Sequence, residues 1–352
     1  MNIILKRQLW FTAIPTMCFI VIILFAVTNC GKEYGTPENQ SDVFIAGWEG
    51  NFAMYWKNGE AISLTDGTLW AQATSIFVLG GDVYVAGHES NVGSWFTTGT
   101  AKYWKNGVAI NLTDGTREAT GNSIFVSGGN VYVAGWERNT QGTRVAKYWR
   151  NGVAVHLSDE TRHAEANSIF VLGDDVYVAG ITAGETGWIT TYWKNGKAVN
   201  LTNETNRIAI PSIFVSGSDV YVAGQDDYAQ GFIAMYWKND EAMNLSDRIH
   251  LGSAHSIFVS NGSVYVAGWE NTGNMPVATY WRKGEAIHVT DGTRVAYANS
   301  IFVSGDDVYV AGSEINAQGK LVAKYWKNGK AISLTDGTRE AYATSIFVVE
   351  RE

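Results

Sequence analysis

Short apolar runs recur along the chain from residue 43 onward, and residues typical of turns separate them. In one stretch these runs cover 300–303, 308–311, 322–326 and 331–334, and the two shortest connections contain Gly-Asp and Asn-Gly. Runs of β-branched and aromatic residues on both sides of such turns predict antiparallel hairpins, because Gly and Asn tolerate positive φ. This stretch therefore predicts a unit of four antiparallel β-strands.

The same unit occurs seven times, as three independent markers indicate. A Ser-Ile-Phe-Val run begins at Ser75, Ser123, Ser168, Ser212, Ser256, Ser300 and Ser345. A Tyr-Trp pair ends at Trp56, Trp104, Trp149, Trp193, Trp237, Trp281 and Trp326. An Ala-Gly pair ends at Gly47, Gly87, Gly135, Gly180, Gly224, Gly268 and Gly312, at intervals of 40 to 48 residues. This period is typical of a four-stranded propeller blade.

Both faces of the predicted strands are apolar, since Ile and Val alternate with Phe, and Tyr alternates with Trp. A sheet with one wet face would alternate apolar and polar residues, so neighbouring sheets must cover both faces. The repeats begin on a second strand, at 43–46, and end on a first strand, at 345–348. We therefore predict an all-β fold: a seven-bladed β-propeller over 43–349, with four antiparallel strands per blade, closed by pairing of the N- and C-terminal strands.

The N-terminal residues have the order of an export signal. Lys6 and Arg7 precede a charge-free apolar run over 9–27, and Cys30 follows. The residues around Cys30 resemble the lipobox of bacterial lipoproteins, although Val27, Thr28 and Asn29 depart from its preferred residues. The resemblance implies a signal peptide over 1–29 and lipidation of Cys30. The polar residues 31–42 predict a flexible tether. An uncleaved membrane anchor and a plain secreted protein are the alternatives.

Charge and cysteine content narrow the function. The chain has 26 basic and 34 acidic residues; without Lys6 and Arg7 the balance is 24 − 34 = −10, which argues against nucleic-acid binding. Cys30 would be the only cysteine left after cleavage. The repeats and the lipobox together resemble bacterial propeller-repeat lipoproteins. This resemblance implies a monomeric propeller, anchored by lipid in the cell envelope at the periplasmic or the surface-exposed side of the outer membrane.

The candidate site lies on the face that carries the longer loops, because variable loops on a rigid scaffold often carry recognition. Acidic residues follow the Ala-Gly pair at Glu49, Glu89, Glu137, Asp226, Glu270 and Glu314. The residues just before them include Trp48, His88, Trp136 and Trp269. Arginines precede four of the first strands, at Arg117, Arg162, Arg294 and Arg339. These residues could form a binding ring for a sugar or a cation. The alternative is a Glu–Arg network between blades that only supports the scaffold.

Departures from the repeat are a second source of candidates. Aromatic residues decorate individual loops at Trp70, Trp95, Phe96, Trp188, Tyr228, Phe232, Tyr297 and Tyr342. The Thr-Asp-Gly-Thr segments, one of them at Asp66, predict ordinary turns rather than calcium loops, since they lack alternating Asp and Asn ligands. The six histidines form no zinc motif, and no nucleophile or phosphate-loop motif is present. We therefore expect neither a metal site nor a cofactor.

These observations predict a binding or assembly module rather than an enzyme, with a protein of the cell envelope as the favoured partner. The alternative ligand is a glycan, which the loop aromatics would bind as in a lectin. A hydrolase or lyase that uses the ring of acidic residues is the third alternative. The fold alone does not decide among them, since propellers carry many functions.

Overall fold

The computed structural model describes residues 41–90, 98–204, 210–228, 231–246, 250–273 and 275–351. The predictions for residues 1–40, which include the signal peptide and the lipidation of Cys30, lie outside this range, as do those for Trp95 and Phe96. In the described part of the chain, no helix is long and apolar enough to span a membrane.

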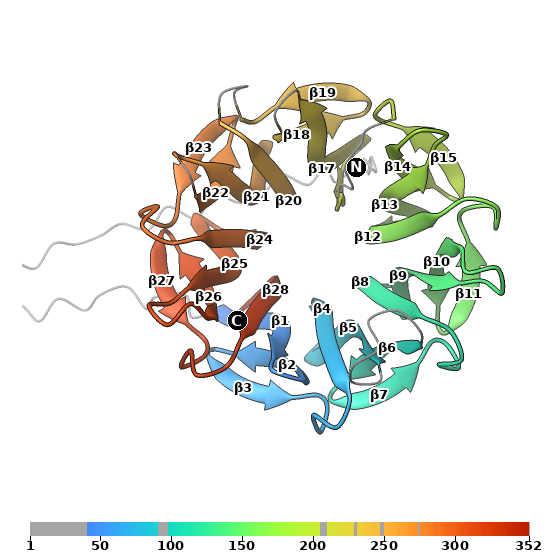
Figure 1. Ribbon diagram of the computed structural model, residues 1–352, viewed down its shortest axis with the longest axis horizontal. Coiled ribbons are helices and arrows are strands. Elements are labelled where there is room, and N and C mark those ends of the chain that lie inside the picture. Colours follow the sequence, from blue (N-terminus) through green and yellow to red (C-terminus); the bar gives the residue numbers. More distant parts are fainter. Residues whose placement is uncertain are drawn as a thin grey trace, which may run out of the picture. The chain divides into compact units, whose positions relative to one another are not determined.

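The described residues form seven four-stranded antiparallel sheets, which confirms the predicted propeller. Figure 1 shows these sheets as blades around a common axis. We number the blades 1 to 7 from the sheet that contains β1. The innermost strands, from blade 1 to blade 7, are β28 (Ala341–Glu350), β4 (Trp70–Leu79), β8 (Ala119–Ser127), β12 (Ala164–Leu172), β16 (Ser212–Ser216), β20 (Gly252–Ser260) and β24 (Ala296–Ser304). The second strands are β1 (Ser41–Glu49), β5 (Asp82–Ser90), β9 (Asn130–Arg138), β13 (Asp175–Ala183), β17 (Asp219–Tyr228), β21 (Ser263–Asn271) and β25 (Asp307–Ile315).

The two outer strands complete each blade. The third strands are β2 (Phe52–Lys57), β6 (Gly99–Lys105), β10 (Arg144–Arg150), β14 (Trp188–Lys194), β18 (Gly231–Lys238), β22 (Pro276–Arg282) and β26 (Leu321–Lys327). The outermost strands are β3 (Glu60–Ser63), β7 (Val108–Asn111), β11 (Val153–His156), β15 (Lys197–Asn200), β19 (Glu241–Asn244), β23 (Glu285–His288) and β27 (Lys330–Ser333).

Blade 1 closes the ring, as predicted. Its innermost strand β28 comes from the C-terminal end of the chain and pairs with β1, from Ser41 opposite Glu350 to Glu49 opposite Ala341. The Arg351 guanidinium also donates to the Asp42 carboxylate across this junction. Because β28 pairs with β1, the sheet of blade 1 is complete where the two ends of the propeller meet.

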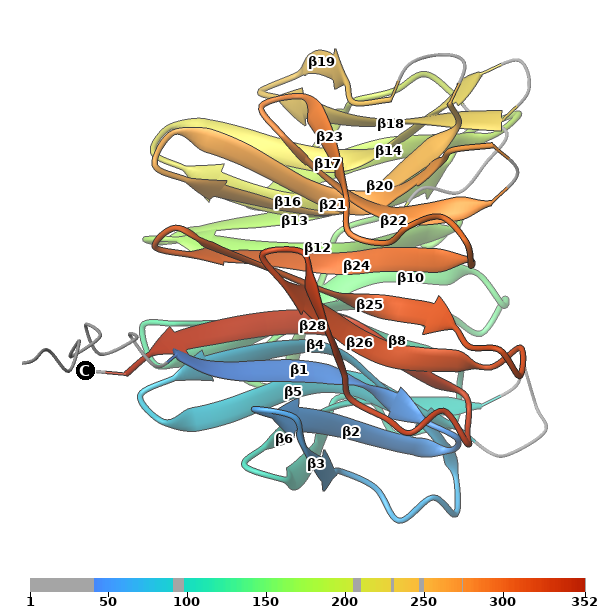
Figure 2. The same cartoon turned by 90° about the vertical axis from the view of Figure 1, so that its left-hand side faces the viewer.

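The strands run between two faces of the ring, which Figure 2 shows from the side. The tight-turn face carries the Gly-Asp and Asn-Gly hairpins together with the free ends of β1 and β28. The long-loop face carries the other connections. On the tight-turn face, Asn58 has a φ of 53° and its side chain accepts a hydrogen bond from Val43 N at 2.8 Å. Asn58 thus permits the positive φ of the turn, and its side chain connects the turn to the adjacent strand β1.

The core lies between the blades. The Trp of each Tyr-Trp pair is almost completely buried, and Trp56 of blade 1 packs against Tyr309 and Ala311 of blade 7. The Ile and Val residues of the innermost strands are buried in the same layers. These seven tryptophans therefore act as spacers that set the distance between neighbouring blades.

Two rings of side chains line the axis. The phenylalanine collar consists of the Phe of each Ser-Ile-Phe-Val run: Phe77, Phe125, Phe170, Phe214, Phe258, Phe302 and Phe347. The serine ring lies two residues earlier on the same strands. Each Ser Oγ accepts a hydrogen bond from the backbone N–H of the Ile in the next blade, at 3.1–3.3 Å. These bonds satisfy the exposed edge of every innermost strand and join all seven blades.

Blade 5 departs from this pattern. Its innermost strand β16 has five residues, whereas the equivalent strands have nine or ten. The other innermost strands contain a bulge one residue before the Ser, for example at Thr74, whereas blade 5 has Pro211 there. Thr74 donates hydrogen bonds to two backbone carbonyl groups, which Pro cannot do. In the described part of blade 5, the innermost strand therefore begins only at Ser212.

Candidate functional site

On the long-loop face, two chemically different groups of side chains lie around the ring, and we call them together the mouth. The first half is an aromatic arc, which consists of Phe232, Trp269, Tyr297, Tyr342 and Trp48. Trp269 meets Phe232 and Tyr297 edge-on, with ring centroids 5.4 and 6.3 Å apart, and Trp48 stacks on Tyr342 at 6.1 Å. The Tyr342 hydroxyl donates to Asn299, which lies two residues from Tyr297. The arc thus extends over blades 5, 6, 7 and 1.

The second half of the mouth is an ionic cluster in blades 3 and 4. The Arg144 guanidinium lies 4.3 Å from the centre of the Trp136 ring and pairs with Glu165. Glu118 accepts from Arg138 at 2.6 Å and lies 4.0 Å from Arg144. Trp136 is 5% exposed, because Arg144 covers its indole. This cluster presents cations, carboxylates and one covered indole beside the axis.

His88 and Trp70 lie between the two halves, in blade 2. Their ring centroids are 5.3 Å apart, and His88 is 9% exposed. Burial lowers the pKa of His88 from 6.5 to about 4, and its Nδ1 has no hydrogen-bond partner among the described residues. His88 is therefore neutral at pH 7 and cannot serve as a cation of the site.

The buried histidine predicts a pH dependence of stability. Because the folded-state pKa of His88 lies below the unfolded value, the unfolded chain takes up the proton first, and stability falls as the pH drops from 6.5 to 4. The loss is expected to approach about 3 kcal/mol, since one pKa unit corresponds to about 1.4 kcal/mol. Urea unfolding of the wild type and of His88→Gln over this pH range measures the effect; Gln225 occupies the equivalent position in blade 5. The variant should lose less stability. Equal losses would contradict the prediction, although His255, whose pKa burial also lowers, keeps part of the dependence in both proteins.

The acidic residues after the Ala-Gly pairs are held mainly by lysines. Glu89 pairs with Lys102, Glu137 with Lys147 at 2.8 Å, and Glu314 with Lys324. Arg117 also lies near Glu137, at 3.5 Å, as one of the predicted Glu–Arg pairs. Each of these lysines precedes a Tyr-Trp pair, a position that holds Met or Thr in the other blades. That signal was present in the sequence, and it indicates a role in packing for these three acids.

The structure spreads the remaining predicted residues over the same face. Glu270 is buried, while Glu49 and Asp226 are half-buried near the ends of their strands. Arg162, Arg294 and Arg339 are exposed, and Arg162 lies 3.8 Å from Glu185 in a neighbouring loop. Arg138, Arg144, Glu118 and Glu165, which sequence reasoning missed, form the ionic cluster on this face.

The Thr-Asp-Gly-Thr segments form the turns that the sequence predicted. Asp66 accepts hydrogen bonds from Thr68 Oγ1 and from Thr68 N, at 2.6 and 2.9 Å, and these bonds hold the pKa of its carboxyl group below the usual range. The same arrangement recurs at Asp114, Asp159, Asp291 and Asp336. The described residues contain no group of three or more His, Cys, Asp or Glu side chains that could hold a metal ion.

Comparison with solved structures finds the same fold in two peptidases. A puromycin-hydrolyzing peptidase from Mycobacterium tuberculosis superposes with a TM-score of 0.55 and 9% identity, over 83% of this chain and 53% of that one. The uncomplexed acylaminoacyl peptidase from Pyrococcus horikoshii gives a TM-score of 0.50 and 12% identity, over 85% and 51% of the two chains. This chain therefore spans about half the length of those proteins, and the likeness shows the fold alone. No protein-family model matches the chain, and no curated protein matches it in sequence.

These comparisons correct one expectation from the sequence. The absence of a catalytic motif predicted that the chain is not an enzyme, and this inference was wrong, because the solved structures that it resembles are named as peptidases. A propeller repeat can belong to a hydrolase without carrying a recognisable nucleophile motif itself. The class that the fold defines is thus a seven-bladed β-propeller of four-stranded blades.

Proposed function

We propose that the chain is a recognition propeller that binds a peptide segment of a partner protein at the mouth on the long-loop face. The observation that carries this proposal is the asymmetry of the mouth on a repetitive scaffold. Repeated residues, such as the Trp spacers and the serine ring, hold the blades together. The aromatic arc and the ionic cluster each occur once, so they are not needed for the repeat.

The chemistry of the mouth favours a peptide over a glycan. Tyr, Trp and Arg, which supply most side chains of the arc and the cluster, are enriched at the centres of protein interfaces. A sugar ring would need the open face of an indole. Trp136 is covered by Arg144, and Tyr342 stacks on one face of Trp48. A peptide with apolar and charged side chains would complement both halves of the mouth.

The proposed location is the bacterial cell envelope, with a lipid on Cys30. The support is the sequence resemblance to a lipobox.

A second candidate function is hydrolysis of the bound peptide. The observation that favours it is the fold shared with the puromycin-hydrolyzing peptidase. Both candidate functions place a peptide at the mouth, and they differ in whether the peptide is cleaved before it is released.

Photo-crosslinking from the mouth tests the proposal. A benzoylphenylalanine that replaces Tyr297 should capture a partner peptide or protein in envelope extracts, whereas the same group in place of Leu172, which is 43% exposed on the tight-turn face, should not. With a captured peptide, Tyr297→Gln is expected to weaken binding at least tenfold, because the arc loses a ring; Gln72 occupies the equivalent position in blade 2. The control Leu172→Ser, with the residue found at Ser127, should bind normally.

The other outcomes separate the alternatives. Mass spectrometry of the peptide after incubation distinguishes binding from hydrolysis. Equal capture from both faces, or wild-type affinity in Tyr297→Gln, would contradict the proposed mouth. Binding on a glycan array that Tyr297→Gln abolishes, without capture of a peptide, would establish the glycan alternative.

A further inference from the structure

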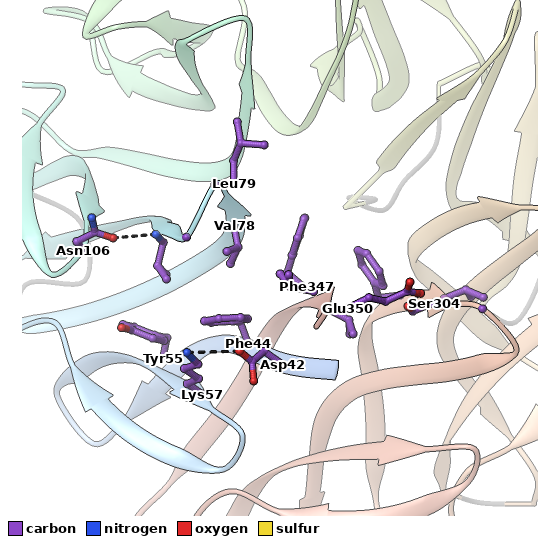
Figure 3. A pocket seen from close by; sticks show the side chains of 18 residues that line it. Asp42, Phe44, Tyr55, Lys57, Val78, Leu79, Asn106, Ser304, Phe347 and Glu350 are labelled. Carbon is purple, nitrogen blue, oxygen red and sulfur yellow. Dashed lines mark hydrogen bonds and ion pairs between the residues drawn. The ribbon is translucent and has the colours of Figure 1, made fainter. Parts of the chain in front are cut away.

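A pocket near the axis lies on the tight-turn face, opposite the proposed mouth. We call it the seam pocket, because blades 7, 1 and 2 surround it where β1 and β28 close the ring. Its volume is about 860 Å³, which is within the range of small-molecule sites. The apolar part of its lining includes Phe44, Val78, Phe302, Phe347 and Val349. Figure 3 shows Phe347 and Val78 among the side chains that line this pocket.

The polar groups at the rim of the seam pocket already have partners. Asp42 accepts from Asn58 and from Arg351, both at 2.8 Å, and lies 3.5 Å from Lys57. The Ser304 hydroxyl donates to Glu350 at 2.5 Å. The two carboxylates and the two cations of this rim balance one another. A ligand would therefore gain little from charge inside the pocket and would bind through apolar contact.

The phenylalanine collar forms the inner end of this pocket, through Phe302 and Phe347. Its seven rings contact one another in a closed circle, with centroids 4.8–5.1 Å apart and interplanar angles of 46–53°. Seven-fold rotation turns each ring by about 51°, so angles near this value mean that the ring planes stand parallel to the axis. At this spacing, rings about 6 Å wide cannot lie flat around the wall, and their edges must point inward.

The collar therefore leaves a narrow apolar opening on the axis. A regular heptagon with sides near 4.9 Å has a radius of about 5.7 Å, and the inward edges of the rings reduce the opening to a width of about 4 to 5 Å. An extended hydrocarbon chain fits such an opening, whereas a phenyl or sugar ring does not. All seven rings are partly exposed, which indicates that solvent or a ligand reaches them.

We propose that the seam pocket and the phenylalanine collar together bind one linear alkyl or acyl chain, with its methyl end in the collar and its polar end at the rim. The walls of the pocket supply apolar contact, and the collar selects an unbranched chain by width. This site is independent of the mouth on the long-loop face and of lipidation at Cys30. The chain could come from a free fatty acid or from a membrane lipid, since both present the same hydrocarbon.

Titration of the purified protein with dodecanoate, followed by calorimetry, tests the site. We expect saturation at one molecule per chain. Ser304→Leu should weaken binding at least tenfold, because the larger side chain fills the pocket; Leu79 and Leu172 occupy the equivalent positions, so the repeat accepts Leu there. Ser260→Leu makes the same change in blade 6, outside the pocket, and should bind as the wild type does.

Sedimentation with vesicles of phosphatidylethanolamine and phosphatidylglycerol identifies the source of the hydrocarbon chain. Binding of either the free acid or the vesicles supports the site.

A second measurement tests the collar. Dodecanoate that carries a terminal phenyl ring should bind the wild type at least tenfold more weakly than the linear acid does. Phe258→Ala, which widens the collar on the side away from the seam pocket, should reduce this preference. The proposal is overturned if neither dodecanoate nor vesicles bind in a saturable way, if Ser304→Leu and Ser260→Leu behave alike, or if the phenyl analogue binds the wild type as tightly as the linear acid.

Discussion

A chain that ends at Glu340 is expected to lose the folded ring. The deletion removes β28, so that blade 1 loses its innermost strand and β1 loses its pairing partner. It also removes Ile346 and Val348, which are 4% and 5% exposed in the core between blades 7 and 1. Burial of each such side chain contributes about 1.5–3 kcal/mol. Together with Phe347 of the collar and the lost backbone bonds, this loss is comparable to the whole stability of an ordinary domain.

Far-UV circular dichroism and urea unfolding measure this effect, and the shortened chain should show no cooperative transition. A chain that ends at Glu350 is the matched control. It loses the pair between Arg351 and Asp42, which is half-exposed and contributes at most about 1 kcal/mol. A synthetic peptide of residues 341–350 should restore cooperative unfolding of the shortened chain, since the joint is non-covalent. A cooperative transition of normal midpoint without the peptide would show that the six other blades are stable with an open ring.

Gly268→Ala is expected to destabilise the protein by about 3 kcal/mol or more. A Cβ at this position would lie 1.9 Å from the backbone oxygen of Ser253 in the adjacent strand, where the bulge brings the two backbones together. Both groups belong to the backbone of paired strands, so neither can move without disrupting the sheet. The Ala-Gly glycines of blades 1, 2, 3, 4 and 7 face the same contact at 1.9–2.0 Å.

Gly224→Ala provides the matched control for this prediction. Among the described residues, the nearest atom to a Cβ at Gly224 is a side-chain carbon of Trp237, at 3.3 Å. We expect this variant to lose less than about 1 kcal/mol, because the indole can shift slightly. Urea unfolding midpoints of the two variants give the comparison. Similar losses at both positions would mean that the Ala-Gly pair is needed for a reason other than the close approach of the backbones.

The fold could be predicted from the sequence because the residues that form the strands and turns of a blade lie close together in the chain. Asn-Gly turns, β-branched runs and the Tyr-Trp pair specify hairpins over a few residues, and seven copies of that code leave a ring as the consistent arrangement. The start of β16 only at Ser212 could also be anticipated in part, since Pro211 replaces a residue that elsewhere donates a hydrogen bond. The candidate site could not be assembled in this way. Trp136 was a candidate for binding a ligand, and Arg144, from the neighbouring strand, covers its indole.

The sequence by itself determined the number of blades, the strand order within them and the closure of the ring by Val43–Ala46 and Ser345–Val348. These properties follow from hydrogen bonding and burial between residues close in the repeat. The tertiary structure alone decided that single aromatic residues from four blades meet in one arc, and that seven phenylalanines narrow the axis. The physical reason is that these contacts join side chains from different strands and blades, and their distances depend on the radius and twist of the closed ring rather than on any local pattern.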